Sequence, residues 1–141
     1  MVKTAQTDEE IARCFEVMAE LRPHLQRDDF VPLVRRMASE GYRLAYIEVD
    51  GRIVSVAGFR LSTNFYLGRH LYIDDLVTTS TARSGGYGSQ LLDWLRRQAT
   101  AAGCGFIDLD SGTQRGGAHK FYFAHGYRIS AYHFVEPLDV S

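Results

Sequence analysis

Three glycines within four residues, Gly85, Gly86 and Gly88, constrain this chain more than any other stretch of its sequence. They follow an apparent strand over residues 71–78 and precede an amphipathic helical pattern. Glycine adopts positive φ angles and lets the backbone approach a ligand closely. A helix that begins at such a turn directs unpaired N–H groups, and the positive end of its dipole, into the same space. Strand, turn and helix together predict an anion-binding site, and we expect the anion to be a pyrophosphate.

The residues after the glycines exclude two common phosphate-binding motifs. A nucleotide P-loop needs Gly-Lys followed by Ser or Thr, but Gly88 is followed by Ser-Gln. The dinucleotide fingerprint needs a third glycine three residues after Gly88, where this sequence has Leu91. What remains is Arg-x-x-Gly-x-Gly, formed by Arg83, Gly86 and Gly88. On this pattern alone, a glycine-rich turn with a purely structural role stays open.

Length and composition indicate one soluble domain over residues 1–141, long enough to bury roughly two-thirds of its unfolded surface. The formal net charge of −1 gives no reason to expect a nucleic acid or an acidic membrane surface as a partner. No apolar run approaches the length of a membrane span, and the charged start is unlike a signal peptide. Cys14 and Cys104 lie in apolar segments, which predicts buried thiols in the cytoplasm.

The first forty residues have the periodicity of helices after a short strand over residues 2–5. A capping box at Thr7 begins one helix, and Pro23 ends it. A second helix is expected with its N-cap at residues 28–29 and with Pro32 in its first turn.

From residue 42 the period changes to that of strands. Two β-branched and aromatic runs, residues 42–49 and 52–60, are joined by Asp50-Gly51, a strong hairpin signal. Residues 62–70 read as a polar and aromatic loop before the strand over residues 71–78.

The second half predicts a crossover and two further elements. The helix after the glycines closes at Gly103, and a short strand follows over residues 106–110. A helix over residues 118–125 and a last strand over residues 127–135 complete the chain. The fold class is therefore α/β (or α+β), with a mixed, mostly antiparallel sheet, helices on both faces and one β-α-β crossover that carries the glycine turn.

With strand, Arg83-x-x-Gly86-x-Gly88 and helix in this order, the chain resembles the GNAT superfamily of acyl-CoA-dependent N-acetyltransferases. A second segment, AHKFYFAHGY over residues 118–127, is similar to that family's Ala-x-x-Φ-Tyr-x-x-x-Gly-aromatic motif, where Φ is apolar. It stands at the family's usual distance after the glycine turn and one strand. The resemblance covers the whole chain and implies a single GNAT-like domain that binds acetyl-CoA, without a metal.

The resemblance implies where coenzyme A lies. Its pyrophosphate would be held by backbone N–H groups of the turn: Ser84, Gly85, Gly86, Tyr87, Gly88 and Ser89. Arg83 would sit at the mouth of the site; alternatively, it is a surface charge that pairs with the sheet edge. The family's strand before this turn splays from its neighbour. Its free backbone groups, here at Leu76, Val77 and Thr78, would pair with the pantetheine arm, and one N–H would polarise the acetyl carbonyl.

The resemblance also implies catalytic residues. Tyr122 matches the family's general-acid tyrosine, and a phenol with a pKa of about 10 can protonate a departing alkyl thiolate. Alternatively, Tyr122 packs with its hydroxyl bonded to the backbone. Asp74 and Asp75 resemble the acidic pair of polyamine-type members and are candidates for attracting the ammonium or relaying its proton. Alternatively, one aspartate caps a bulge and the other is solvated. Neighbours on a strand point to opposite faces, so we expect only one of them to face the acceptor.

Two features depart from the family pattern. Arg115 stands where many members carry an Asn that bonds the pantetheine arm, so Ser111, Thr113 or Gln114 would take over that bond, or Arg115 would read an acidic group. Only 15 residues follow Gly126, too few for the family's closing hairpin. The last strand is then lost or very short, and a partner subunit covering the exposed edge would make a homodimer.

The sequence therefore predicts a cytoplasmic enzyme that moves an acetyl group from acetyl-CoA to a primary amine by direct transfer in a ternary complex. No cysteine stands in either motif to carry the acyl group. The alternative is a non-catalytic acyl-CoA-binding sensor or interaction module on the same fold. The acceptor stays open among polyamines, amino acids, aminoglycoside-like compounds and protein amines.

Overall fold

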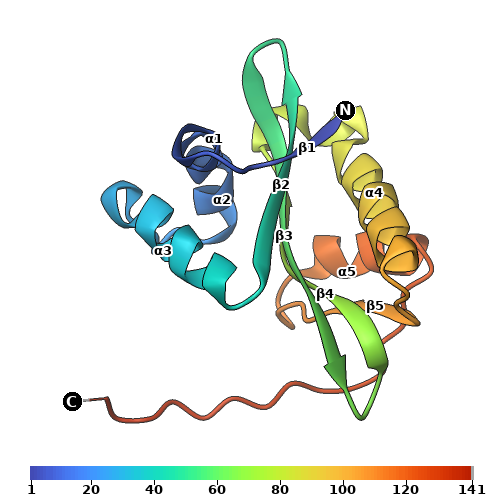
Figure 1. The fold of residues 1–141 in the computed structure, drawn as a ribbon. Coiled ribbons are helices and arrows are strands. Elements are labelled where there is room, and N and C mark those ends of the chain that lie inside the picture. Colours follow the sequence, from blue (N-terminus) through green and yellow to red (C-terminus); the bar gives the residue numbers. More distant parts are fainter. Residues whose placement is uncertain (141) are drawn as a thin grey trace. The chain divides into compact units, whose positions relative to one another are not determined.

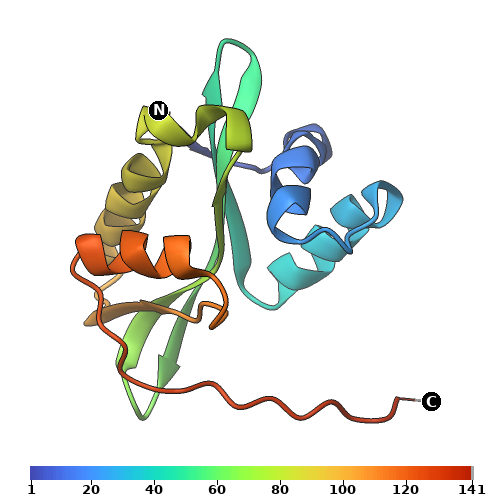
Figure 2. The ribbon, with the colours of Figure 1, turned by 180° about the vertical axis from the view of Figure 1, so that it is seen from behind.

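The computed structural model describes residues 1–140 (Figures 1 and 2). The chain divides into two compact units, Met1–Leu109 and the residues from Asp110 on. The first unit contains a five-stranded sheet, and the second contains one helix and the C-terminal segment. The expectation of a single domain over residues 1–141 stays a prediction.

The sheet of the first unit has its strands in chain order from one edge to the other. They are β1 (Val2–Thr4), β2 (Tyr42–Val49), β3 (Arg52–Asn64), β4 (Gly68–Thr78) and β5 (Phe106–Leu109). The first three pairings are antiparallel, and β4 pairs with β5 in parallel. This confirms the predicted mixed, mostly antiparallel sheet with one crossover.

Helices cover both faces of this sheet (Figure 1). One face carries α1 (Asp8–Arg13), α2 (Phe15–Leu21) and α3 (Arg27–Ser39). The other carries the 3₁₀ helix η1 (Ser80–Gly85) and α4 (Tyr87–Ala101), which form the crossover from β4 to β5. On the first face Phe15, Phe30 and Tyr42 belong to one buried cluster. On the second, Phe59 and Trp94 meet edge to face with ring centroids 5.7 Å apart.

The local signals with a stereochemical cause are confirmed. Asp50 and Gly51 have φ angles of 51° and 79°, as a two-residue type I′ turn requires, and Val49 pairs directly with Arg52. The Thr7 hydroxyl accepts the N–H of Glu10, whose carboxylate accepts the Thr7 N–H, so the capping box is present.

The predicted loop over residues 62–70 is wrong. β3 and β4 continue as a hairpin as far as the pair Asn64–Gly68, and a short turn lies between them. The Asn64 side chain closes this turn by accepting the Leu67 N–H at 2.7 Å, and Gly68 has a φ of 69°. Ser62, Thr63 and Asn64 are consecutive polar residues that are all exposed, so this strand end has no apolar alternation and looks like a loop in the sequence.

Two helix boundaries also differ from expectation. The first predicted helix is divided into α1 and α2 at Cys14, which caps both. α3 begins at Arg27 with Gln26 as its N-cap, so residues 28–29 lie in its first turn and Pro32 lies further inside. Carboxylates favour the first turn as well as the cap, because both positions lie near the positive end of the helix dipole.

In the second unit, α5 (Gly116–Ala124) replaces the helix expected over residues 118–125 and ends before Gly126, whose φ is 86°. The predicted strand over residues 127–135 is wrong: residues 127–140 have no regular secondary structure. An alternating pattern predicts a strand only if another strand accepts its hydrogen bonds, and the described part of this unit contains none.

Candidate functional site

The glycine turn leads directly into the N-terminus of α4. Gly86, with φ 77° and ψ 15°, is the N-cap residue and supplies no side-chain cap. The first intrahelical bond runs from the Gln90 N–H to the Gly86 carbonyl at 3.1 Å. N–H groups of the first turn, such as those of Tyr87 and Gly88, therefore lie outside the helical ladder. With the helix dipole, they give the geometry that an anion site needs, and the predicted pyrophosphate site stays a prediction.

The glycines of this turn are needed for different reasons. Gly86 is the only one of the three with a positive φ. A Cβ atom on Gly85 would lie 2.4 Å from the Tyr87 ring, so any larger residue there would displace that ring. The sequence predicts the turn correctly, but it does not show which glycine is needed for its positive φ and which for the space it leaves to the Tyr87 ring.

Two charged side chains make hydrogen bonds to the residues that lead from β4 into the turn. The carboxylate of Glu20, on α2, accepts the Ser80 N–H at 3.0 Å and the Thr79 hydroxyl. The Nε of Arg83 donates to the Thr78 carbonyl at 3.3 Å, which is the sheet-edge contact of the alternative reading. Arg83 therefore lies beside Thr78, another of the predicted binding residues, and its role toward a pyrophosphate stays a prediction.

β4 has an unpaired edge just before the turn. The parallel ladder with β5 ends at the pair Ile73–Leu109, and among residues 1–140 no strand continues it along β4. The Thr79 N–H donates to the Val54 carbonyl of β3. Because backbone groups alternate in direction along a strand, Leu76 and Thr78 direct theirs away from β3, whereas Val77 faces it. The chain thus has the free strand edge that the resemblance implies.

Ser55 is a buried polar residue beneath this edge. Its hydroxyl donates to the Val77 carbonyl at 3.1 Å and lies 2.8 Å from the Thr78 hydroxyl. It ties β3 to the three-residue segment that we expect to hold the pantetheine arm. Sequence reasoning missed Ser55, because a single serine in an apolar strand gives no signal of its partner.

A β-bulge brings both acidic residues to one side of the sheet. Gly58 pairs with Asp75, but the next residue, Phe59, pairs with Ile73, so Asp74 is an extra residue in β4. Both aspartates therefore contact side chains on the same face of the sheet, and which of them faces the acceptor stays a prediction. Strict alternation applies to a regular strand, and the bulge interrupts it here.

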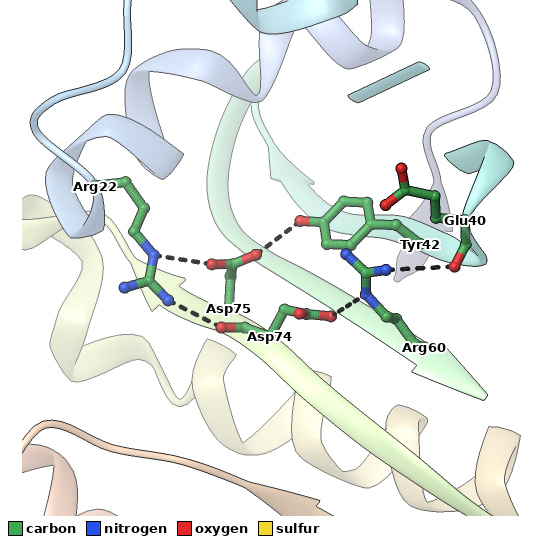
Figure 3. Close-up of polar contacts among 6 residues, drawn as sticks. All are labelled: Arg22, Glu40, Tyr42, Arg60, Asp74 and Asp75. Atoms are coloured by element: carbon green, nitrogen blue, oxygen red, sulfur yellow. Dashed lines mark hydrogen bonds and ion pairs between the residues drawn. The ribbon is translucent and has the colours of Figure 1, made fainter. Parts of the chain in front are cut away.

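The two carboxylates belong to one network of ion pairs and hydrogen bonds (Figure 3). Arg22 donates from Nε to Asp75 Oδ1 and from Nη2 to the Asp74 carbonyl, both at 3.0 Å. The Tyr42 hydroxyl donates to Asp75 Oδ2 at 2.8 Å. Arg60 Nε donates to Asp74 Oδ2 at 3.1 Å. Each carboxylate is thus paired with one guanidinium.

Gly58 makes room for the tyrosine in this network. A Cβ atom on Gly58 would lie 1.8 Å from the Tyr42 hydroxyl oxygen and 2.3 Å from the ring carbon that bears it. Only glycine lets the Tyr42 ring cross β3 and reach Asp75. Sequence reasoning did not identify Gly58, Tyr42 or Arg22, because the residues that contact one another stand tens of positions apart in the chain.

Burial changes the acidity of two members of the network. The pKa of Tyr42 is raised well above its ordinary value, first by desolvation and then by the negative charge of Asp75. Tyr42 is therefore a permanent hydrogen-bond donor at neutral pH. Desolvation also raises the pKa of Asp74, although the Arg60 guanidinium acts in the opposite direction.

The remaining predicted residues lie in the second unit. Tyr122 is on α5, where its ring lies 5.4 Å from Phe121 and 5.7 Å from Tyr127, centroid to centroid. Burial raises the pKa of Tyr122, and the positive charge of Arg115 opposes this. Arg115 is the N-cap residue of α5. The Ser111 hydroxyl is buried and makes no hydrogen bond within residues 1–140, so it has an unused donor and acceptor.

Within residues 1–140 the structure contains neither a metal-binding group of side chains nor a membrane-spanning helix. In the described part of the chain, no three His, Cys, Asp or Glu side chains are grouped so that they could hold a metal ion. No helix within residues 1–140 is long and apolar enough to span a membrane.

Comparison with known proteins identifies the family. The model of the acetyltransferase (GNAT) family matches residues 5–127. The chain belongs to the GNAT family. YhdJ of Bacillus subtilis (strain 168), named an uncharacterized N-acetyltransferase, is 36% identical over 139 residues, which cover 97% of this chain and 98% of YhdJ.

A second relative is also named as an N-acetyltransferase, and a solved N-acetyltransferase structure has the same fold. An aminoalkylphosphonate N-acetyltransferase of Salmonella typhimurium is 35% identical over 99 residues, covering 69% of this chain and 62% of the relative. The structure of an aminoglycoside N-acetyltransferase in complex with CoA has a TM-score of 0.85 at 12% identity and shares the fold over 99% of this chain and 96% of that one. This GNAT chain is therefore an acyl-CoA-dependent N-acetyltransferase, as the sequence predicts.

The network around the acidic pair makes a testable contribution to stability. Replacing Tyr42 by Phe should lower the free energy of unfolding by roughly 1.5–3 kcal/mol, because a hydrogen bond to a charged, largely buried acceptor is lost. Tyr46→Phe is the matched control: its ring is equally buried, but its hydroxyl makes a longer bond, 3.3 Å, to the partly buried carboxylate of Glu10. Urea denaturation of both variants should show the larger loss for Tyr42→Phe. Equal losses would contradict the assigned contact.

Proposed function

We propose that the chain transfers an acetyl group from acetyl-CoA to a primary amine by direct attack within a ternary complex. The observation that carries this proposal is the continuity of β4. Its unpaired edge at Leu76 and Thr78 leads through η1 to the proposed anion site at the N-terminus of α4. One strand and the turn after it would thus bind both the extended arm and the pyrophosphate of a CoA thioester.

The donor side needs only backbone groups. An extended pantetheine arm would add to the edge of β4 as a strand does, since Leu76 and Thr78 direct their N–H and carbonyl groups there. An N–H at this edge would also stabilise the oxyanion that forms when the amine attacks the thioester carbonyl. The N–H groups of the first turn of α4, with residues 83–89 around them, would hold the pyrophosphate.

The acceptor side needs a group that removes a proton from the ammonium. Asp74 suits this task better than Asp75, because desolvation raises the pKa of Asp74 and a base works best with a pKa near the working pH. Asp75 is held by both Arg22 and Tyr42 and would act through charge and position. The proton would pass to Asp74 directly or through one water molecule.

The leaving thiolate needs a proton, and Tyr122 is the proposed donor. A tyrosine hydroxyl is protonated at neutral pH and can donate this proton. Burial raises the pKa of Tyr122 and makes it a weaker acid, and the positive charge of Arg115 opposes this effect. The buried hydroxyl of Ser111, which has no hydrogen-bond partner within residues 1–140, is the better candidate of the second unit for a contact with the pantetheine arm. Arg115 would then face an acidic group of a ligand.

The relatives favour catalysis over mere binding. Two proteins at 35–36% identity carry the name N-acetyltransferase, and one of them acts on aminoalkylphosphonates by name. This supports a small primary amine as the acceptor for this chain as well, in preference to a protein side chain. A binding module without catalysis would need neither the acidic pair nor Tyr122.

Binding of the donor depends on the backbone of the turn. Gly86→Ala should weaken CoA binding strongly, because alanine disfavours the positive φ that directs the N-terminus of α4. Gly103→Ala is the matched control, since Gly103 has a φ of 75° just after the other end of the same helix. Both variants should lose similar stability, but only Gly86→Ala should lose the rise in melting temperature with CoA. Equal CoA responses would argue against the proposed site.

Turnover should depend on the Tyr122 hydroxyl. We expect Tyr122→Phe to lower kcat by roughly 10²- to 10⁴-fold, the usual contribution of a general acid, while the Kd for CoA stays nearly the same. Thiol release and calorimetric titration with CoA measure the two quantities. Tyr132→Phe, in the exposed C-terminal segment, is the control and should retain full turnover. Unchanged turnover in Tyr122→Phe would remove this residue from the mechanism.

The acidic pair should shape the dependence of the rate on pH. A base that takes the proton from the bound ammonium must be ionised, so log kcat/KM should rise with a slope of about one below the pKa of that base and level off above it. The raised pKa of Asp74 places this rise at higher pH than an ordinary aspartate would. In Asp74→Asn this rise should be absent. The role is wrong if neither Asp74→Asn nor Asp75→Asn changes the profile or the KM for the acceptor.

A further inference from the structure

The two arginines beside the acidic pair are held in different ways (Figure 3). Arg60 is fixed from three directions: Nε donates to Asp74, Nη1 donates to the Glu40 carbonyl at 3.3 Å, and the guanidinium lies over the Tyr42 ring, 5.5 Å from its centroid. Arg60 is thus built into the structure between β3, β2 and the end of α3.

Arg22 is anchored at one side and open at the other. It is the C-cap residue of α2, and its Nε and Nη2 hold Asp75 and the carbonyl of Asp74. Its second terminal nitrogen, Nη1, makes no hydrogen bond within residues 1–140. The Arg22 side chain is 43% exposed, whereas that of Asp75 is 11% exposed. Arg22 is therefore more accessible to a ligand than either carboxylate, since Asp74 is 23% exposed.

The network is also balanced in charge. Two carboxylates face two guanidiniums, so the acidic pair offers no excess of negative charge to a ligand that is only cationic. A ligand with one ammonium and one anionic group preserves the balance: the ammonium lies against a carboxylate, and the anion lies against a guanidinium. Polyamines, which carry several positive charges and no anion, fit this arrangement poorly.

We propose that Arg22 binds an anionic group, a phosphonate or a carboxylate, on the acceptor amine, and that the preferred acceptors are therefore small zwitterionic amines. This inference rests on the proposed function. A guanidinium presents parallel N–H donors that match the oxygens of these anions, and Arg22 retains free donors on its exposed side.

The position of Arg22 relates the anion to the reaction. Arg22 donates to the carbonyl of Asp74, the bulge residue that immediately precedes the free edge of β4. An anion held by Arg22 would keep a short amine near both Asp74 and the segment proposed to hold the thioester. Arg22 is thus a specificity-determining residue, whereas Arg60 is a positioning residue for Asp74.

The test compares acceptors that differ only in the anion. Two anionic amines, 2-aminoethylphosphonate and β-alanine, are compared with ethanolamine. For the wild type, kcat/KM for the better of the two anionic amines should be at least about tenfold higher than kcat/KM for ethanolamine, as expected for one charge-assisted hydrogen bond. Arg22→Gln should reduce this ratio by roughly 10- to 100-fold. Arg60→Gln is the matched control: it should lower the rates for all acceptors together and leave the ratio nearly unchanged.

The outcomes separate this inference from the proposed function. Acetylation of all amines without preference for the anionic ones, or a clear preference for spermidine, would overturn the role of Arg22 and leave the acetyltransferase proposal intact. No acetylation of any amine by a protein that binds CoA would overturn both. If Arg22→Gln does not fold, methylphosphonate tested on the wild type decides: it should inhibit acetylation of ethanolamine competitively, and lack of inhibition would contradict the inference.

Discussion

The β-bulge at Asp74 is the feature on which the rest of the site depends. One extra residue in β4 shifts its register against β3. Asp74 and Asp75 therefore both contact side chains on the face of the sheet that carries Tyr42 and Arg60. Bulges also bend a strand and increase its twist. The ladder between β4 and β5 stops at Ile73, the residue before the bulge, and the free edge begins there. The one extra residue in β4 thus lies both in the acidic pair and next to the unpaired strand edge that is proposed to bind the donor.

Two carboxylates at the edge of a hydrophobic core would be costly without partners, and the surrounding residues reflect this. Tyr42 lies in the same buried cluster as Phe15 and Phe30, yet its hydroxyl reaches Asp75. Arg22 and Arg60 supply the opposite charges. Loss of one partner from a buried pair leaves an uncompensated charge, which is more destabilising than the pair is stabilising. Gly58 belongs to the same arrangement, because a side chain there would exclude the tyrosine that completes it.

Sequence reasoning succeeded where the cause of a structure is local. The glycine turn, the Asp50-Gly51 hairpin and the capping box at Thr7 each follow from φ angles or hydrogen bonds within a few residues. It failed where the cause lies far along the chain. Arg22 and Asp75 are 53 positions apart, and no local pattern joins them. The predicted strand over residues 127–135 failed for the same reason, because strand formation depends on a partner.

The balance of forces on Asp74 explains how one carboxylate can serve both stability and proposed catalysis. Burial raises its pKa and makes it a stronger base, whereas the Arg60 guanidinium lowers its pKa and keeps it ionised. Each influence alone would move the pKa in one direction: burial without a partner favours the protonated acid, and pairing without burial makes the carboxylate a weaker base. Arg60 is fixed by the Glu40 carbonyl and the Tyr42 ring, so this balance is set by the fold before any acceptor binds. The more exposed Arg22 is then the guanidinium left with free donors for the acceptor itself.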